Sequence, residues 1–151
     1  MWKGPGLAAE VAQVAHTQAD LFEHRPYKGD FRMHTHHSDG VESPAYVAAA
    51  CRKIGMDFMA ITDHRKYAPS LEAMRMFAGV ETDLRIYPGE EVHPPENWVH
   101  MLNFGGSFSV NELFKSERYR TEVQAIADHL VDFPEGVDRY PYASCVWTFE
   151  Q

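Results

Sequence analysis

The alternation of strand-like and helix-like segments is the feature of this chain that most constrains its fold. Four short segments predict strands, "YKGDFRMHT", "MDFMAIT", "LRIYPGEEV" and "WVHMLNFGG". Between the first two, Ser43 suits a helix N-cap, Pro44 the first helical position and Gly55 the stop. Strands that alternate with helices are typical of an α/β architecture with a mainly parallel sheet.

Further helices are predicted at 7–22, 70–79 and 109–130, and another begins near Pro141. Ser70 is the expected cap of the second of these. Ser109 and Glu112 have capping-box spacing and predict the start of one long helix.

Polar side chains follow the predicted strands. "HTHHSD", "TDH" and "GEE" each lie at the end of a strand, and His100 lies inside a fourth. In α/β folds the chemistry gathers at the carboxyl ends of the strands, so these segments are expected to meet at one rim. The candidates are His34, His36, His37, Asp39, Asp63, His64, Glu90, Glu91 and His100.

These residue types indicate a metal site. Imidazole and carboxylate ligands without thiolates suit catalytic zinc, manganese or iron better than a closed structural zinc site. On an extended strand His34 and His36 share a face, while His37 points away. Taken singly, each segment also fits a structural turn, and four histidines are predicted to be structural: His16, His24, His93 and His129.

The overall composition limits the function. The 151 residues, 44% of them hydrophobic, indicate one globular domain. A formal net charge of −8 argues against a general nucleic-acid-binding protein, which needs a basic face. Anionic substrates would be repelled unless a cation is held locally, and a metal site would provide that cation.

Cysteine usage and hydropathy indicate a cytoplasmic protein. Cys51 and Cys145 are too few for a disulfide framework, and their apolar helical context predicts that both are reduced and buried. No apolar run approaches the roughly 20 residues needed to cross a bilayer. The start of the sequence lacks the pattern of a secretory signal.

Four segments, "GDFRMHTHHSDG", "FMAITDH", "YPGEEV" and "VHMLNFG", occur in this order between about Asp30 and Gly105. Together they resemble the first four motif regions of the PHP (polymerase and histidinol phosphatase) superfamily. The resemblance implies a distorted, TIM-like β/α barrel of about seven strands, incomplete here with about four or five mainly parallel strands. It also implies two or three divalent metal ions at the carboxyl rim.

The resemblance assigns metal ligands by motif position. Aligned on "SDG", the second histidine of the first motif falls on His34, and its metal-binding aspartate falls on Asp39. His64 matches the metal-binding histidine of the second motif. Glu91 matches a glutamate that tends to bridge two metals, and His100 matches the histidine of the next motif.

One position departs from the family pattern. Arg32 replaces the first histidine, and a guanidinium cannot ligate a cation. Arg32 is expected either to bind a substrate phosphate or to pair with a carboxylate. His36 could supply the missing nitrogen, or His36 and His37 are solvated turn residues. Arg65 and Lys66 could bind a phosphate or belong to a solvated loop.

The family has further ligands beyond the last residue of this chain, so the sequence is expected to be a fragment. Residues 1–29 are predicted to form an N-terminal helix and linker, and residues 30–151 a truncated PHP-like domain. An open barrel edge would favour a homo-oligomer or a domain swap.

The resemblance implies metal-dependent hydrolysis of phosphoesters in the intact protein, with zinc, manganese or iron as cofactor and little or no activity in the fragment. Asp63 and Arg32 are further catalytic candidates, although Asp63 could instead cap a turn. The expected substrate is a phosphorylated small molecule or nucleotide. Two alternatives stay open, a non-catalytic metal-binding or regulatory module and a metal-dependent hydrolase of a non-phosphate substrate.

Overall fold

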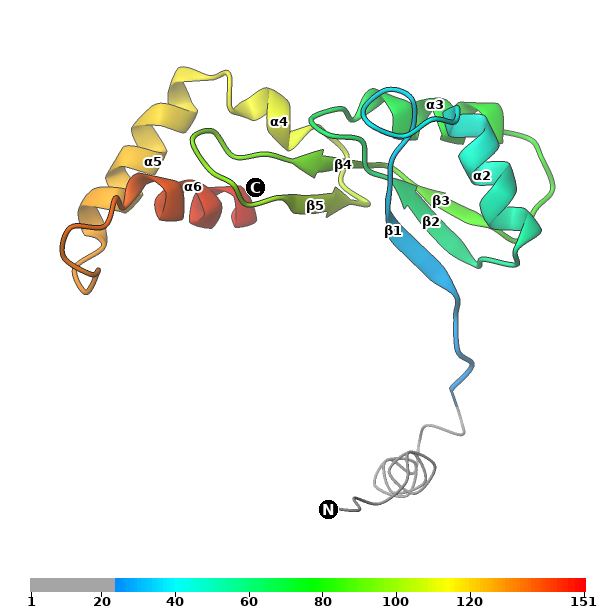
Figure 1. Cartoon of the computed structure of the whole chain (residues 1–151), viewed down its shortest axis with the longest axis horizontal. Helices are drawn as coiled ribbons and strands as arrows, with labels where there is room; N and C mark the ends of the chain where they lie inside the picture. The colour runs from blue at the N-terminus through cyan, green and yellow to red at the C-terminus, as the bar shows by residue number, and fades with distance from the viewer. Residues whose placement is uncertain (1–23) are drawn as a thin grey trace, which may run out of the picture.

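A computed structural model describes residues 24–151 and contains a parallel sheet, an antiparallel strand pair and a pair of packed helices (Figure 1). The helix predicted at 7–22, and His16 within it, lie outside the described residues. The elements in chain order are β1 (Gly29–Met33), α2 (Pro44–Lys53), β2 (Phe58–Ile61), α3 (Ala68–Met76), β3 (Arg85–Tyr87), β4 (Gly89–Val92), β5 (Met101–Phe104), α4 (Val110–Leu113), α5 (Glu117–His129) and α6 (Tyr140–Phe149). The predicted mixed α/β class is confirmed, and the barrel stays a prediction.

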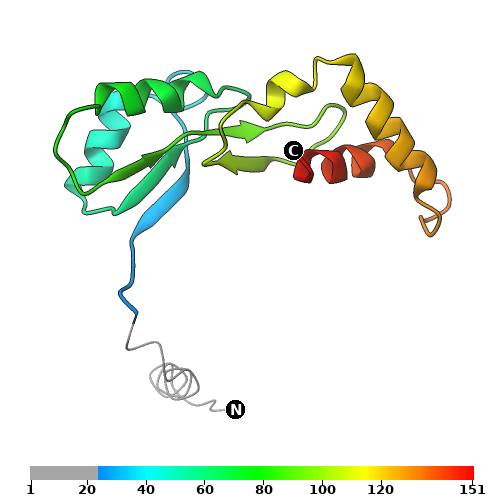
Figure 2. The same cartoon turned by 180° about the vertical axis from the view of Figure 1, so that it is seen from behind.

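The first three strands form a sheet in the order β1-β2-β3, with both pairs parallel. Helices α2 and α3 cover one face of this sheet (Figures 1 and 2). The core between them is made of apolar side chains that alternate along the strands with those of the opposite face. Its buried members are Ala48, Cys51, Met59, Ile61, Ala73 and Leu84.

The segment "LRIYPGEEV", predicted as one strand, forms two strands in different sheets. Pro88 separates β3 from β4, because proline has no N–H to donate to a ladder. Strand β4 pairs with β5 in the antiparallel direction, so the expectation of a mainly parallel sheet holds only for the first three strands. His100 was predicted inside a strand, and it instead immediately precedes β5.

The cap predictions for α2 are confirmed, because the Ser43 side chain accepts from the Tyr46 amide and Pro44 is the first helical residue. The long helix predicted at 109–130 is wrong as a single element. The chain leaves the helix after α4, and Ser116 provides a second N-cap that starts α5.

One other helix prediction and one burial prediction need correction. Helix α3 begins at Ala68, two residues before the predicted cap, and Ser70 is instead a buried residue inside its first turn. Its hydroxyl donates to the Tyr67 carbonyl and accepts from the Gly89 amide. Helix α6 starts where expected and packs against α5, and it leaves Cys145 half-buried rather than fully buried.

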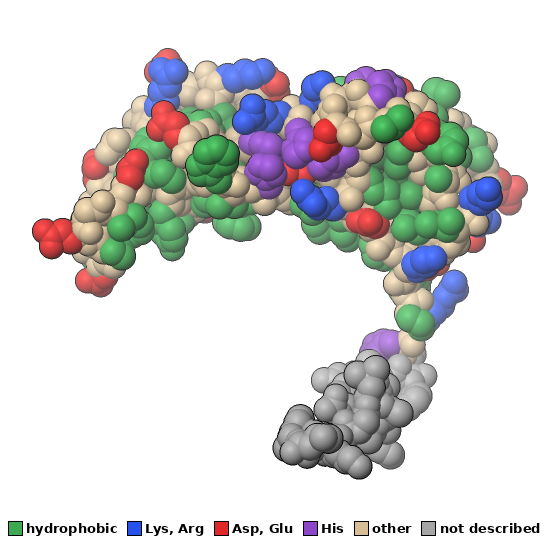
Figure 3. Space-filling model, in the orientation of Figure 1, with side chains coloured by type: hydrophobic (Ala, Val, Ile, Leu, Met, Phe, Trp, Pro, Cys, Tyr) green, Lys and Arg blue, Asp and Glu red, His purple; other side chains and the backbone are tan. Residues whose placement is uncertain are grey.

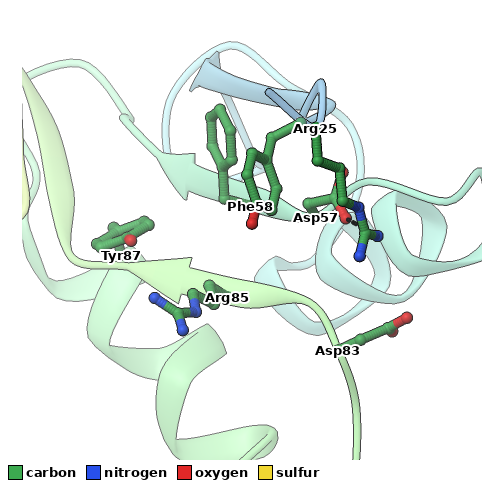
Figure 4. A pocket seen from close by; sticks show the side chains of 7 residues that line it. Arg25, Asp57, Phe58, Asp83, Arg85 and Tyr87 are labelled. Carbon is green, nitrogen blue, oxygen red and sulfur yellow. Dashed lines mark ion pairs between the residues drawn. The ribbon is translucent and has the colours of Figure 1, made fainter. Parts of the chain in front are cut away.

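The face of the parallel sheet away from α2 and α3 carries stacked aromatic rings. Phe31 stacks on Phe58 and on Phe104, with ring centroids 4.8 and 4.0 Å apart. A cavity of about 440 Å³ opens around the amino-terminal ends of β2 and β3, beside Phe58, Arg85 and Tyr87 (Figure 4). Within residues 24–151 no helix is long and apolar enough to cross a membrane.

Candidate metal centre

Backbone pairing beyond the ends of β1 and β2 brings distant polar segments to one edge. The Thr62 amide donates to the Met33 carbonyl at 2.8 Å, and the Glu91 amide donates to the Asp63 carbonyl at 3.1 Å. His64 and Glu91 consequently form an isolated parallel bridge. The histidines gather near the middle of the molecular face shown in Figure 3.

Glu91 lies at the centre of these histidines, and its side chain is 0% exposed. Its Oε2 is 2.8 Å from Nε2 of His34, in a hydrogen bond. Its Oε1 lies 2.5 Å from Nδ1 of His100, 3.4 Å from Nδ1 of His64 and 3.5 Å from Nε2 of His93. None of these three approaches has hydrogen-bond geometry, so Oε1 is a buried oxygen without a hydrogen-bond partner among the described residues.

The potential ligand atoms fall into two groups that share His64. In each group, one nitrogen or oxygen of every member lies within 4.8 Å of those of the others. The carboxylate of Glu91 connects the groups, because Oε1 belongs to the first and Oε2 is bonded to His34 of the second. The first group is His64, Glu91, His93 and His100, and the second is His34, Asp39 and His64.

The electrostatics keep the carboxylates ionised and one imidazole neutral. Burial raises the pKa of Glu91, but His64, His34 and Arg32 outweigh burial and hold it below its usual value. The hydrogen bond from His34 lowers the pKa of Asp39. Burial, aided by the charges of neighbouring groups, lowers the pKa of His93 to about 4, so its ring is neutral at pH 7.

These residues fit a divalent cation. Neutral imidazoles and carboxylates are the donors that zinc, manganese and iron accept. Burying an unpaired carboxylate oxygen costs free energy unless a cation compensates it, and three ring nitrogens surround Glu91 Oε1. His100 is 42% exposed, so this part of the cluster is accessible from solvent.

His93, predicted from the sequence to be structural, lies among the potential ligands of the first group. Its ring lies 3.9 Å from that of His100 between centroids, and its Nε2 lies 2.8 Å from Nδ1 of His64. A signal for this position exists in the sequence. Glu91 and His93 are two residues apart on an extended segment, so their side chains point to the same face.

The structure keeps His36 and His37 out of both groups. Their rings stack on each other, with centroids 4.5 Å apart. His36 contacts the Glu42 carbonyl at 3.2 Å, and Nε2 of His37 lies 3.3 Å from the carboxylate of Glu72. Neither histidine is placed to supply the ligand nitrogen of the motif histidine that Arg32 replaces. His129 hydrogen-bonds to the Ala125 carbonyl on α5, far along the chain from the centre.

Two buried carboxylates outside the two groups form hydrogen bonds that hold neighbouring segments in place. Asp63 accepts from the Thr35 amide and hydroxyl, both at 2.7 Å, and from the Ser38 hydroxyl. It therefore fixes the turn between His34 and Asp39 and does not hydrogen-bond to any imidazole of the two groups. Glu90 points to the opposite side of β4 from Glu91 and accepts from Ser109, Val110, Asn111 and Asn103.

The three cationic candidates have different surroundings. Nε of Arg32 lies 3.6 Å from Glu91 Oε2 while its side chain remains 61% exposed, which is the carboxylate pairing anticipated from sequence. The ammonium of Lys66 donates a hydrogen bond to the His37 carbonyl. The Arg65 amide donates to the Glu91 carbonyl, and its side chain borders hollows that also contain His64 and His93.

The fold and these donor atoms define an α/β protein with a candidate divalent-metal centre. Over 66 residues the chain is 44% identical to the DNA polymerase/3'-5' exonuclease PolX of Bacillus subtilis. This match covers 42% of the chain and 12% of PolX, so the chain corresponds to a small part of that protein. The match supports the resemblance of the four motif segments to a PHP domain.

A crystal structure from Bifidobacterium adolescentis, of a protein proposed to be a metal-dependent phosphoesterase, superposes with a TM-score of 0.44 and 23% identity. That superposition covers 85% of this chain and 53% of the other. No protein-family model matches the chain.

Proposed function

We propose that this chain is the metal-binding part of a phosphoesterase, which hydrolyses phosphoesters with water activated by divalent ions. The observation that carries the proposal is the environment of Glu91. A fully buried carboxylate has one oxygen bonded to His34 and the other among three imidazoles without a hydrogen bond. A cation shared by these groups would compensate the buried charge.

Each group of ligand atoms is proposed to hold one ion, with Glu91 between the two. Zinc, manganese and iron all suit imidazole and carboxylate donors. Bound ions of this kind would supply hydroxide at neutral pH and polarise a phosphoryl oxygen. The proposed ligands are His34, Asp39, His64, Glu91, His93 and His100.

The cationic side chains are proposed to bind the substrate phosphate. The exposed guanidinium of Arg32 can contact a phosphate while it stays close to Glu91. Arg65 and Lys66 border the hollow of about 510 Å³ that contains His64 and His93. In a protein with a formal net charge of −8, such local cations are needed to attract an anion. Asp63 is proposed as a positioning residue, since its carboxylate holds the turn that carries Asp39.

The proposed substrate is a phosphorylated small molecule or a nucleotide. PolX is named as a DNA polymerase and 3'-5' exonuclease, so its substrate contains nucleotide phosphoesters. This chain spans 12% of PolX. Its metal centre is proposed to bind a phosphoester without the remaining parts of a protein of that length.

The test compares His64→Ala with His36→Ala in the purified chain, after loading with manganese or zinc. Both residues are histidines of the same region, but only His64 belongs to the two ligand groups. We expect His64→Ala to lose bound metal in the chain, and to lose hydrolysis of 4-nitrophenyl phosphate in a longer protein that contains the chain, while His36→Ala retains both.

Two results would replace the proposal. Metal that binds to the unaltered chain without any phosphoester turnover, also in a longer protein that contains the chain, favours a regulatory or metal-binding module. The pairing of Arg32 with Glu91 is the observation on the side of that alternative. Metal-dependent hydrolysis of amides alone favours a hydrolase of a non-phosphate substrate.

A further inference from the structure

Trp98 is the most exposed large apolar side chain of the described residues, with 98% of its surface accessible. It lies in the segment between β4 and β5 and lines the same hollow as His93 and His100. An indole can bury 150–250 Å² against another surface, and here its ring stacks on no other described ring. An exposed indole that lines a hollow together with His93 and His100 is available to contact a molecule bound there.

The segment that carries Trp98 is held in place. Nδ2 of Asn97 donates to the Pro141 carbonyl at 2.7 Å and to Sγ of Cys145 at 3.0 Å, which ties the segment to α6. Its Oδ1 accepts from the Val99 amide at 2.9 Å. Glu96 has a φ of 59°, in the left-handed region that non-glycine residues rarely adopt. The backbone therefore presents the indole from a defined position.

A hollow of about 410 Å³ connects Trp98 to the metal centre. Trp98, Pro94 and Pro95 form its apolar part, and His93 and His100 form part of its wall. Its volume lies within the range of small-molecule sites. A molecule whose phosphate lies at the two imidazoles would extend along this hollow over the indole.

Arg65 fixes the orientation of such a molecule. Arg65 borders the same hollow, and no carboxylate among residues 24–151 forms an ion pair with it. Arg65 also has a left-handed backbone, with a φ of 57°, while its amide is bonded to the Glu91 carbonyl. Glu96, which is two residues from Trp98 in the sequence, also borders the hollow, and its charge would repel a phosphate. The phosphate is thereby favoured at Arg65 and the uncharged part at Trp98.

We propose that Trp98 is a specificity-determining residue, which stacks on a planar aromatic group of the substrate. The substrate class is then a phosphoester whose alcohol part carries such a group, of which a nucleoside monophosphate is the representative. This inference rests on the proposed function, since it assigns the substrate class of the same centre. Stacking of a base on an aromatic side chain corresponds to about a 5- to 150-fold change in affinity.

The experiment measures equilibrium binding of AMP and of ribose 5-phosphate to the metal-loaded chain by calorimetry. We expect Trp98→Ala to weaken AMP binding by about 5- to 150-fold and to leave ribose 5-phosphate unchanged. Trp98→Phe keeps a ring and should restore most of the loss. Phe149→Ala, which removes another exposed ring far along the chain, should change neither.

A third ligand, 4-nitrophenyl phosphate, distinguishes recognition of any planar ring from recognition of a nucleobase. Equal weakening for AMP and this ester in Trp98→Ala supports recognition of any planar ring, and weakening for AMP alone supports a nucleobase. Unchanged AMP binding in Trp98→Ala, or no AMP binding by the unaltered chain, overturns the inference. The proposed function fails separately if a longer metal-loaded protein that contains the chain hydrolyses none of the three esters, because the binding measurements do not depend on turnover.

Discussion

Glu90 and Glu91 are consecutive residues of β4, both fully buried, and their carboxylates have opposite surroundings. Glu90 accepts hydrogen bonds from the amide and side-chain donors at the start of α4, including Nδ2 of Asn111 at 2.8 Å. Glu91 has an oxygen with no hydrogen bond, 2.5 Å from a ring nitrogen of His100. Because successive side chains of a strand point to opposite faces, Glu90 has a structural role and Glu91 faces the histidines.

This contrast predicts different consequences for one chemical change. Glu91→Gln should remove most of the bound divalent metal, because the amide supplies no charge to either group. Glu90→Gln should destabilise the fold by about 1.5–3 kcal/mol, the range for hydrogen bonds to a charged group, and leave the metal content of the folded protein unchanged. Urea unfolding and elemental analysis of both variants test this. Equal loss of metal in both would mean that the integrity of β4, rather than the Glu91 carboxylate, supports binding.

The two groups of ligand atoms predict separable metal stoichiometry. His93→Ala should lose the ion of the first group and His34→Ala the ion of the second, whereas His64→Ala should lose both. His37→Ala is the matched control, since its ring pairs with Glu72 outside the groups. Metal counted per protein in each variant decides this. An identical stoichiometry in His93→Ala and the unaltered chain would remove His93 from the ligands.

Gly40 is not a ligand, but its replacement is expected to weaken metal binding. A Cβ at this position would meet the His34 carbonyl oxygen at 2.5 Å, which is backbone that cannot rotate away. Gly40→Ala should therefore displace the turn that carries Asp39 and weaken metal binding by about 10- to 100-fold, as for outer-shell changes in other sites.

The control for this change is Gly55→Ala, at a φ of 75° with no atom within 4 Å of the added Cβ. It should cost about 1 kcal/mol of stability through its left-handed backbone and leave metal affinity unchanged. Titration with a chelating competitor measures the affinity of both variants. Normal affinity in Gly40→Ala would show that the turn adapts without moving Asp39.

Tyr119 predicts a loss of stability at alkaline pH. Burial raises its pKa from 10.0 to about 12, and its hydroxyl is bonded to Oγ of Ser144 at 2.9 Å. The unfolded chain releases this proton near pH 10 and the folded chain only near pH 12, so the free energy of unfolding falls as the pH rises between these values. Urea unfolding from pH 9 to 11.5 measures the slope. Tyr119→Phe should flatten it, and an unchanged slope would assign the effect to other groups.

Local signals in the sequence predicted much of the fold. Ser43 and Pro44 start α2, and Ser109 starts α4, because cap and first-turn preferences act over a few residues. The breaks after β3 and after α4 were missed. Pro88 and Ser116 could have indicated them, but an apolar segment or a capping box by itself does not say where an element ends.

The sequence alone determined that imidazoles and carboxylates follow successive strands, since residue type and order are written in the chain. It also determined the PHP motifs that the match to PolX supports. Only the tertiary structure decided that His93 lies with His64 and His100, that His36 and His37 lie apart, and that Arg32 approaches Glu91. The physical reason is that ligand geometry depends on pairing between strands far apart in sequence and on the direction of each side chain, which local preferences do not specify.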